Sequence, residues 1–199
     1  MSASQRESLQ KTLRDGNYKD AYEGFRKLAL DPNADARLVG EDLQAAIQCL
    51  MRLNRTHEVD EFREAVVRVH SGNWRLLRSA AQSYMSVPHQ GFLIAGEFHR
   101  GRHRGGGEVV NATERDRVRA LQLAHQALAL ALEDENHAEV GSFLLELAGI
   151  LLNNRGHNEA WRLQYLTDLG ELPDYEPGWG YYGGTSGAPV DAEGRPVFH

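Results

Sequence analysis

The stretch from Gly16 to Pro32 constrains the fold of this chain most, because its residues divide between two faces at the spacing of an α-helix. Charged residues cover one face, and the other face is apolar or small. The apolar face consists of Tyr18, Ala21, Tyr22, Phe25, Leu28 and Ala29. Gly16 suits the end of a preceding helix, from about Ser4 to Asp15, and Pro32 stops the second helix. The pattern predicts a helical hairpin whose apolar face needs a cover.

The same stretch resembles a known repeat. Its order of Gly-Asn-Tyr, a small alanine, an aromatic residue, Lys-Leu and Asp-Pro is similar to the second half of a tetratricopeptide repeat. An isolated hairpin of this kind cannot bury its apolar face, so further copies are expected along the chain. The resemblance implies that hairpins stack side by side, with small residues where two helices come close.

Two further hairpins follow the same pattern. One runs from Val39 to Val69 with a turn at Asn54-Arg55, and the other runs from Val140 to about Leu169. The offset from the first hairpin to the second exceeds the ~34 residues of a standard repeat, so the units are degenerate. Single helices are also expected from Asn73-Trp74 to just before Pro88, and from about Ala112, with Thr113 as its cap, to Leu132.

These patterns predict an all-α protein, a right-handed stack of antiparallel helical hairpins of the TPR-like α-solenoid type. The repeat domain spans residues 1–169, with an irregular insertion at 87–113, where glycines interrupt the helical spacing. One short helix from Phe92 to Phe98 is compatible with that insertion. Residues 170–199 form a tail rich in Gly, Pro and aromatic residues, either a free linker or a segment that lies against the last helices.

The insertion carries the one cluster that suggests chemistry, His99-Arg100-Gly101-Arg102-His103-Arg104. One interpretation is a solvated basic loop. A second is a contact for an anion or an acidic partner, made by Arg100, Arg102, His103 and Arg104 with the amides of the glycines at 105–107. A third is a metal site in a helix, where His99 and His103 share an ion at a spacing of four residues, although no carboxylate accompanies them.

Composition excludes several classes of function. The formal net charge of -6 provides no general attraction for nucleic acid or for an anionic membrane. No stretch is long and apolar enough for a membrane span, so no membrane insertion is expected. Cys49 is the only cysteine, which rules out an intrachain disulfide. The charge run from Glu114 to Arg117 is typical of a solvated helix end. We therefore expect no enzyme, no cofactor and no resident metal.

Several phrases resemble the helical region at the start of large bacterial alpha-macroglobulin-like proteins. They are residues 73–77 (NWRLL), 88–92 (PHQGF), 103–107 (HRGGG), 114–123 (ERDRVRALQL), 160–169 (AWRLQYLTDL) and 187–191 (GAPVD). The resemblance implies a helical module of a longer, envelope-associated protein whose later domains trap proteases. The family's thioester motif, a Cys followed closely by Glu-Gln, does not match Cys49, which precedes Leu50-Met51-Arg52.

The function expected from these patterns is a protein-protein interaction scaffold, whose partner is another domain of the same polypeptide or a separate protein. The alternative is a metal- or anion-binding protein that uses residues 99–107. The location is extracytoplasmic if the macroglobulin resemblance holds, and cytoplasmic if the chain is complete as given. No apolar leader is visible in the first residues.

Overall fold

The computed structural model describes residues 3–151 and 169–179, which form seven α-helices and a four-stranded antiparallel sheet. The helices are α1 (Ala3–Arg14), α2 (Tyr18–Ala29), α3 (Val39–Arg52), α4 (Val59–Val69), α5 (Trp74–Ser86), α6 (Thr113–Ala131) and α7 (His137–Leu151), with a 3-10 turn, η1 (Thr56–Glu58), before α4. The strands are β1 (Gln90–Ile94), β2 (Glu97–Arg100), β3 (Glu108–Asn111) and β4 (Glu176–Pro177), in the order β2-β1-β3-β4.

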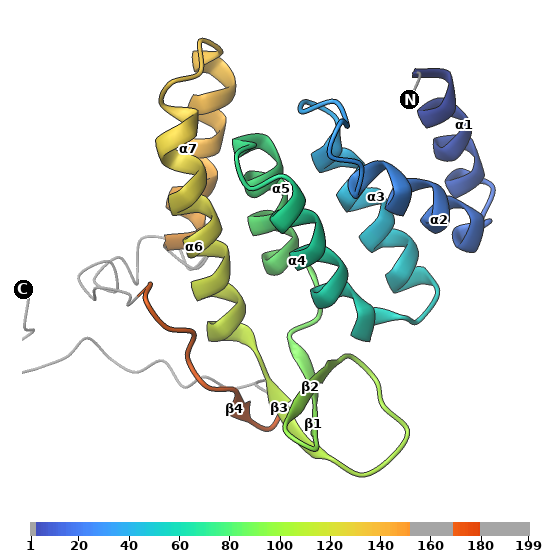
Figure 1. Ribbon diagram of the computed structural model, residues 1–199. Helices are drawn as coiled ribbons and strands as arrows, with labels where there is room; N and C mark the ends of the chain where they lie inside the picture. Colours follow the sequence, from blue (N-terminus) through green and yellow to red (C-terminus); the bar gives the residue numbers. More distant parts are fainter. Residues whose placement is uncertain (1–2, 152–168, 180–199) are drawn as a thin grey trace, which may run out of the picture.

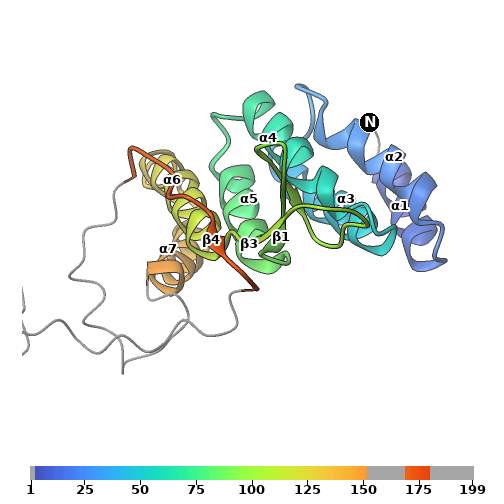
Figure 2. The ribbon, with the colours of Figure 1, turned by 90° about the horizontal axis from the view of Figure 1, so that it is seen from below.

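The helices stand side by side, with α1 at one end of the molecule and α6 and α7 at the other (Figures 1 and 2). Each helix packs on its neighbours, since α3 contacts both α2 and α5, and α5 contacts α6. One hydrophobic core of buried side chains runs from α2 to α7. The sheet lies at one end of the helices, below α4, α5 and α6 in Figure 1. The protein is therefore a row of helices with a small sheet at its edge.

The first hairpin has the structure that its sequence predicts. The apolar positions of α2 are buried, apart from Tyr18, which is half-buried. The turn between the two helices contains Gly16, whose φ of 84° lies in the left-handed region that glycine accepts without strain. A Cβ added to Gly24 would lie 2.1 Å from Leu9 Cδ2, so the missing side chain is what lets α1 approach α2. A small residue therefore lies where α1 and α2 come close.

The turn and cap positions were predicted with mixed success. Asn54 forms the turn between α3 and α4, with a φ of 56°, and the Asn73 side chain accepts a hydrogen bond from Arg75 N at 3.1 Å. Thr113 is not a cap, because it is the first residue of α6, and Asn111 Oδ1 accepts from its backbone N–H at 3.3 Å. Within the third hairpin α7 forms as expected, whereas the returning helix falls outside the described residues.

The expectation of a helical fold is confirmed in part: the described residues are mostly helical, but they are not all-α and the insertion is not irregular. Residues 90–111 supply three strands, and the short helix expected from Phe92 to Phe98 is a β-hairpin instead. Its turn residues, Ala95 and Gly96, have φ values of 51° and 85°. Positive φ at both central positions characterises the two-residue turn whose twist matches that of the flanking strands. The turn therefore closes β1 onto β2 and excludes a helix.

The first part of the predicted tail packs on the protein. Residues 169–179 run back along α6 and add β4 to the edge of β3 (Figure 1). Arg115 Nη1 donates to the carbonyl oxygen of Pro173 at 2.7 Å, and the Tyr175 ring stacks on Phe98 with centroids 4.6 Å apart. Gln122 Nε2 donates to the Leu169 carbonyl at 2.9 Å. The rest of the tail, residues 180–199, lies outside the described residues, so the choice between a free linker and a packed segment stays open there.

Candidate binding surface

The register of the sheet assigns the residues of the predicted basic cluster to opposite faces. Phe92 is opposite His99 across the β1–β2 pair, and Gly91 is opposite Arg100. Since successive side chains of a strand point to opposite faces, Phe92 and His99 share one face and Arg100 points to the other. The second face is the inner one, because Arg100 is only 3% exposed. His99 and Arg100, which are adjacent in the sequence, thus lie on opposite faces of the sheet.

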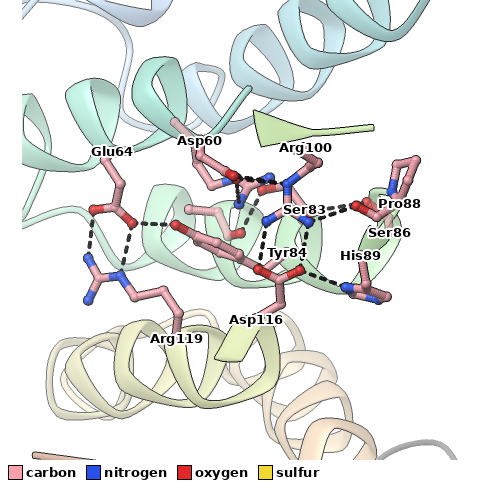
Figure 3. Close-up of polar contacts among 12 residues, drawn as sticks. Asp60, Glu64, Ser83, Tyr84, Ser86, Pro88, His89, Arg100, Asp116 and Arg119 are labelled. Atoms are coloured by element: carbon pink, nitrogen blue, oxygen red, sulfur yellow. Dashed lines mark hydrogen bonds and ion pairs between the residues drawn. The ribbon is translucent and has the colours of Figure 1, made fainter. Parts of the chain in front are cut away.

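Arg100 is an interior anchor between the sheet and the helices (Figure 3). Its two terminal nitrogens donate to the two carboxylate oxygens of Asp116, each at 2.7 Å, and Nε donates to Asp60 Oδ2 at 2.9 Å. Nη1 also donates to the carbonyl oxygen of Pro88 at 2.7 Å. Burial alone would lower the pKa of Arg100, but the hydrogen bonds and charges of Asp116 and Asp60 outweigh it and raise that pKa. Arg100 therefore stays charged in the interior.

Asp116 completes the anchor from the side of α6. Its carboxylate lies 2.6 Å from His89 Nδ1 and is 3% exposed. Burial raises the pKa of Asp116, but the hydrogen bonds from His89 and Arg100 have the larger combined effect and lower it. The interpretation of residues 114–117 as a solvated charge run is therefore wrong for Asp116. The Asp116 carboxylate can be buried because its partners, His89 and Arg100, reach it from other parts of the chain.

The charged network continues from Asp60 into α4 and α5. Arg63 Nη1 donates to Asp60 Oδ1 at 3.2 Å, and its guanidinium lies 3.6 Å from the centre of the Tyr84 ring. The Tyr84 hydroxyl donates to Glu64 Oε1 at 2.6 Å, and Arg119 Nη2 donates to Glu64 Oε2 at 2.7 Å. Arginines and carboxylates of α4, α6 and β2 thus alternate, and Tyr84 of α5 lies between Arg63 and Glu64. Such a chain of paired charges holds the sheet in one position on the helices.

The outer face of the sheet carries a cluster of aromatic and histidine side chains, of which Trp179 is exposed. Phe92 lies at its centre, with the Trp179 ring 6.0 Å away in a T-shaped arrangement and the His103 ring 5.8 Å away. The His99 and His103 rings are 6.1 Å apart. Trp179 is 51% exposed, and Phe92 is half-buried. A large aromatic side chain that lies open to solvent beside another is a feature of contact surfaces.

The loop from β2 to β3 borders this face with basic side chains. It passes close to β1, because a Cβ added to Gly107 would lie 3.1 Å from the Leu93 carbonyl oxygen. Arg102 and Arg104 are exposed, and neither has a hydrogen-bond or ion-pair partner among the described residues. We call this surface the basic-aromatic face. It comprises Phe92, His99, Arg102, His103, Arg104 and Trp179.

The structure separates the residues predicted to make an anion or partner contact. Arg102, His103 and Arg104 lie in the exposed loop that borders the outer face, where the His103 ring is 5.8 Å from Phe92, whereas Arg100 belongs to the interior anchor. Sequence reasoning missed Phe92 as a surface residue, because a strand of five residues is too short for its alternation to be recognised. It also missed Asp60 and Arg63, which resemble ordinary solvated charges of an amphipathic helix.

The metal interpretation loses its geometric basis. It required His99 and His103 on one helix, but His99 is in β2 and His103 is in the following loop. In the part of the chain that the structure describes, no group of three or more His, Cys, Asp or Glu side chains is placed to hold a metal ion.

A second exposed apolar surface lies on α7. Leu145 is 77% exposed and Leu144 is 40% exposed. Beside them is a shallow groove between α5 and α7, lined by Gln82, Met85, Ser86, Leu145, Glu146, Gly149 and Ile150. None of the helices in residues 3–151 has the length and apolar character needed to cross a bilayer.

No protein-family model, characterised protein or solved structure matches this chain. Interpretation of the surface therefore depends on the chemistry of its residues.

Proposed function

We propose that this chain is a protein-binding scaffold, a right-handed TPR-like stack of helical hairpins that holds a small sheet at its edge for contact with a partner protein. The basic-aromatic face is the observation that carries the proposal. It combines an exposed tryptophan with two arginines that have no partner among the described residues. Tryptophan and arginine are the residue types most enriched among those that dominate the binding energy of protein interfaces.

The interior anchor supports this function because it makes the face rigid before binding. Residues that are already ordered lose less conformational entropy when a partner arrives. His99 on the outer face immediately precedes Arg100, which has hydrogen bonds to Asp60 and Asp116. The strand that carries part of the binding surface is thereby fixed to α4 and α6. We propose binding and not catalysis, since Asp60, Glu64 and Asp116 on the inner side of the sheet are each paired with an arginine.

The resemblance to alpha-macroglobulin-like proteins sets the proposed context. We propose that the scaffold is a helical module of a larger envelope-associated protein of the protease-inhibitor type. Its partner is then another domain of the same polypeptide or a separate protein. The exposed leucines of α7 offer a further apolar contact area for such a neighbour.

A second candidate function is the binding of a small anion. Arg102 and Arg104 supply unpaired guanidinium groups beside the Gly105–Gly107 segment, whose backbone N–H groups are additional donors. Isothermal titration with inorganic phosphate and with citrate tests this alternative. We expect no measurable binding of either anion, because two exposed arginines hold a small anion only weakly. Such a result leaves contact with a protein as the function of these arginines.

Site-specific photocrosslinking in the native cell tests the scaffold function. A photoreactive amino acid replaces Arg102 in one variant and Trp179 in another, and Lys19 on the exposed side of α2 serves as the control position. We expect a crosslinked protein, identified by mass spectrometry, at positions 102 and 179 in preference to position 19. Absence of a protein adduct at all three positions would contradict the proposal.

A further inference from the structure

We infer that the basic-aromatic face binds a short acidic segment of the partner protein, in which one or two carboxylates stand next to an aromatic or large apolar side chain. This inference rests on the proposed scaffold function and names the chemistry that the scaffold recognises. The argument depends on the charge of the loop, on the exposed ring of Trp179, and on two glutamates that limit the extent of the basic surface.

The carboxylates are recognised by Arg102 and Arg104. The planar guanidinium of arginine donates two parallel hydrogen bonds to one carboxylate, a geometry that lysine does not offer. Both side chains are exposed and have no ion pair in residues 3–151 or 169–179, so no internal contact has to break before they bind. Arg100 lies two residues before Arg102, and its three side-chain nitrogens already donate hydrogen bonds to Asp60 and Asp116. The free positive charge of this region is therefore confined to the loop.

The apolar part of the segment packs on Trp179 and Phe92. Trp179 has about half of its surface in solvent and meets the Phe92 ring edge to face, at 6.0 Å between centroids. The Phe92 ring is also close to the His103 ring, at 5.8 Å between centroids. The loop residue next to Arg102 and Arg104 thus touches the same ring as Trp179. A ligand that packs on Phe92 therefore lies next to the loop that carries both arginines.

The surrounding charges favour a short protein segment over a polyanion. Glu97 and Glu108 are exposed at the far end of the β1–β2 hairpin, opposite Ile94 and Leu93 in the register. They place negative charge at the turn end of the hairpin, and the whole chain has a formal net charge of -6. Nucleic acid and anionic bilayers extend over many phosphates and need a broad basic surface. One or two carboxylates match two arginines without approaching the glutamates.

The test measures binding of fluorescently labelled eight-residue peptides to the full chain by anisotropy. The probe is a pool in which two adjacent glutamates precede a Phe, Trp or Leu. One matched pool replaces both glutamates with glutamine, and a second replaces the aromatic or apolar residue with alanine. We expect the acidic pool to bind, the glutamine pool to bind at least about ten-fold more weakly, and the alanine pool to lose about three-fold or more.

Variants of the protein then locate the binding site. Arg102→Met combined with Arg104→Met is expected to weaken binding about ten-fold, and Trp179→Ala about three-fold or more. The matched control combines Arg68→Met with Lys19→Met, which removes two exposed positive charges from α4 and α2 and leaves affinity unchanged. Thermal unfolding checks that each variant is folded. These residues are exposed, so we expect no loss of structure.

Four outcomes overturn the inference. They are absence of binding by the acidic pool, equal binding of the glutamine pool, wild-type affinity of the double arginine variant, and tighter binding of a phosphopeptide, an oligonucleotide or phosphatidylserine vesicles than of the acidic pool. The scaffold function is tested separately. A protein adduct at position 102 in the cell, together with failure of the acidic pool, would refute recognition of an acidic segment and leave the scaffold function intact.

Discussion

Replacement of Arg100 with methionine tests whether the buried ionic anchor holds the sheet on the helices. Methionine has an unbranched apolar side chain of similar length, so the substitution removes mainly the charge and its hydrogen bonds. It leaves Asp116 3% exposed with His89 as its remaining side-chain partner. Loss of one member of a buried ion pair typically costs about 3–5 kcal/mol, because the other charge is left without compensation. We expect a loss of that size in the free energy of unfolding.

The assay is urea unfolding followed by circular dichroism, with thermal melts in parallel. For a chain of this size a loss of ~3–5 kcal/mol corresponds to a fall in melting temperature of roughly 6–20 °C. Arg102→Met is the matched control, since that arginine is exposed and has no partner in the described part of the chain. We expect it to leave the melting temperature unchanged. A second variant, Arg100→Met with Asp116→Leu, removes both charges and should recover part of the lost stability.

Two results would refute this reasoning. One is a cost below about 1 kcal/mol for Arg100→Met, which would mean that solvent or His89 alone compensates the charge of Asp116. The other is an equal loss of stability for Arg102→Met, since that would show that the buried position of Arg100 is not what matters.

Three further predictions follow from the same contacts. Because the folded-state pKa of Asp116 is depressed, its stabilisation is complete above the pKa of the unfolded chain, near ~4, and is lost as pH falls through the folded value. Urea melts from pH 6 to pH 3 should show a steeper loss for the natural protein than for Asp116→Asn. Burial raises the pKa of Cys49 to about 11, so a thiol reagent at pH 8 should label it only after unfolding; labelling of the folded protein at the rate of a free thiol would contradict this. Gly24→Ala should destabilise the protein by about 1–3 kcal/mol because of its contact with Leu9. The matched change Gly141→Ala on α7, where a new Cβ meets nothing within 4 Å, should stabilise by about 0.5–1 kcal/mol, and a gain for both changes would contradict the close approach of α1 and α2.

Half of the candidate surface was foreseeable from residue types. The cluster from His99 to Arg104 stands out in the sequence because it combines basic residues with glycine, and four of its residues belong to the basic-aromatic face. The aromatic half was not foreseeable. Phe92 and Trp179 are far apart in the chain and meet only because residues 169–179 return to the sheet beside β3. A sequence pattern of a few residues cannot predict a contact between side chains that are so far apart in the chain.

The helices from α1 to α7 were determined by the sequence itself, because a helix satisfies its own backbone hydrogen bonds within each turn and shows its buried face every three or four residues. Tertiary structure alone decided the sheet and the burial of Arg100. Strands of two to five residues form their hydrogen bonds with partners elsewhere in the chain. Glu176 of β4 pairs with Asn111 of β3, 65 residues earlier. A buried guanidinium is likewise stable only where carboxylates converge on it, and Asp60 and Asp116 reach Arg100 from opposite sides through folding.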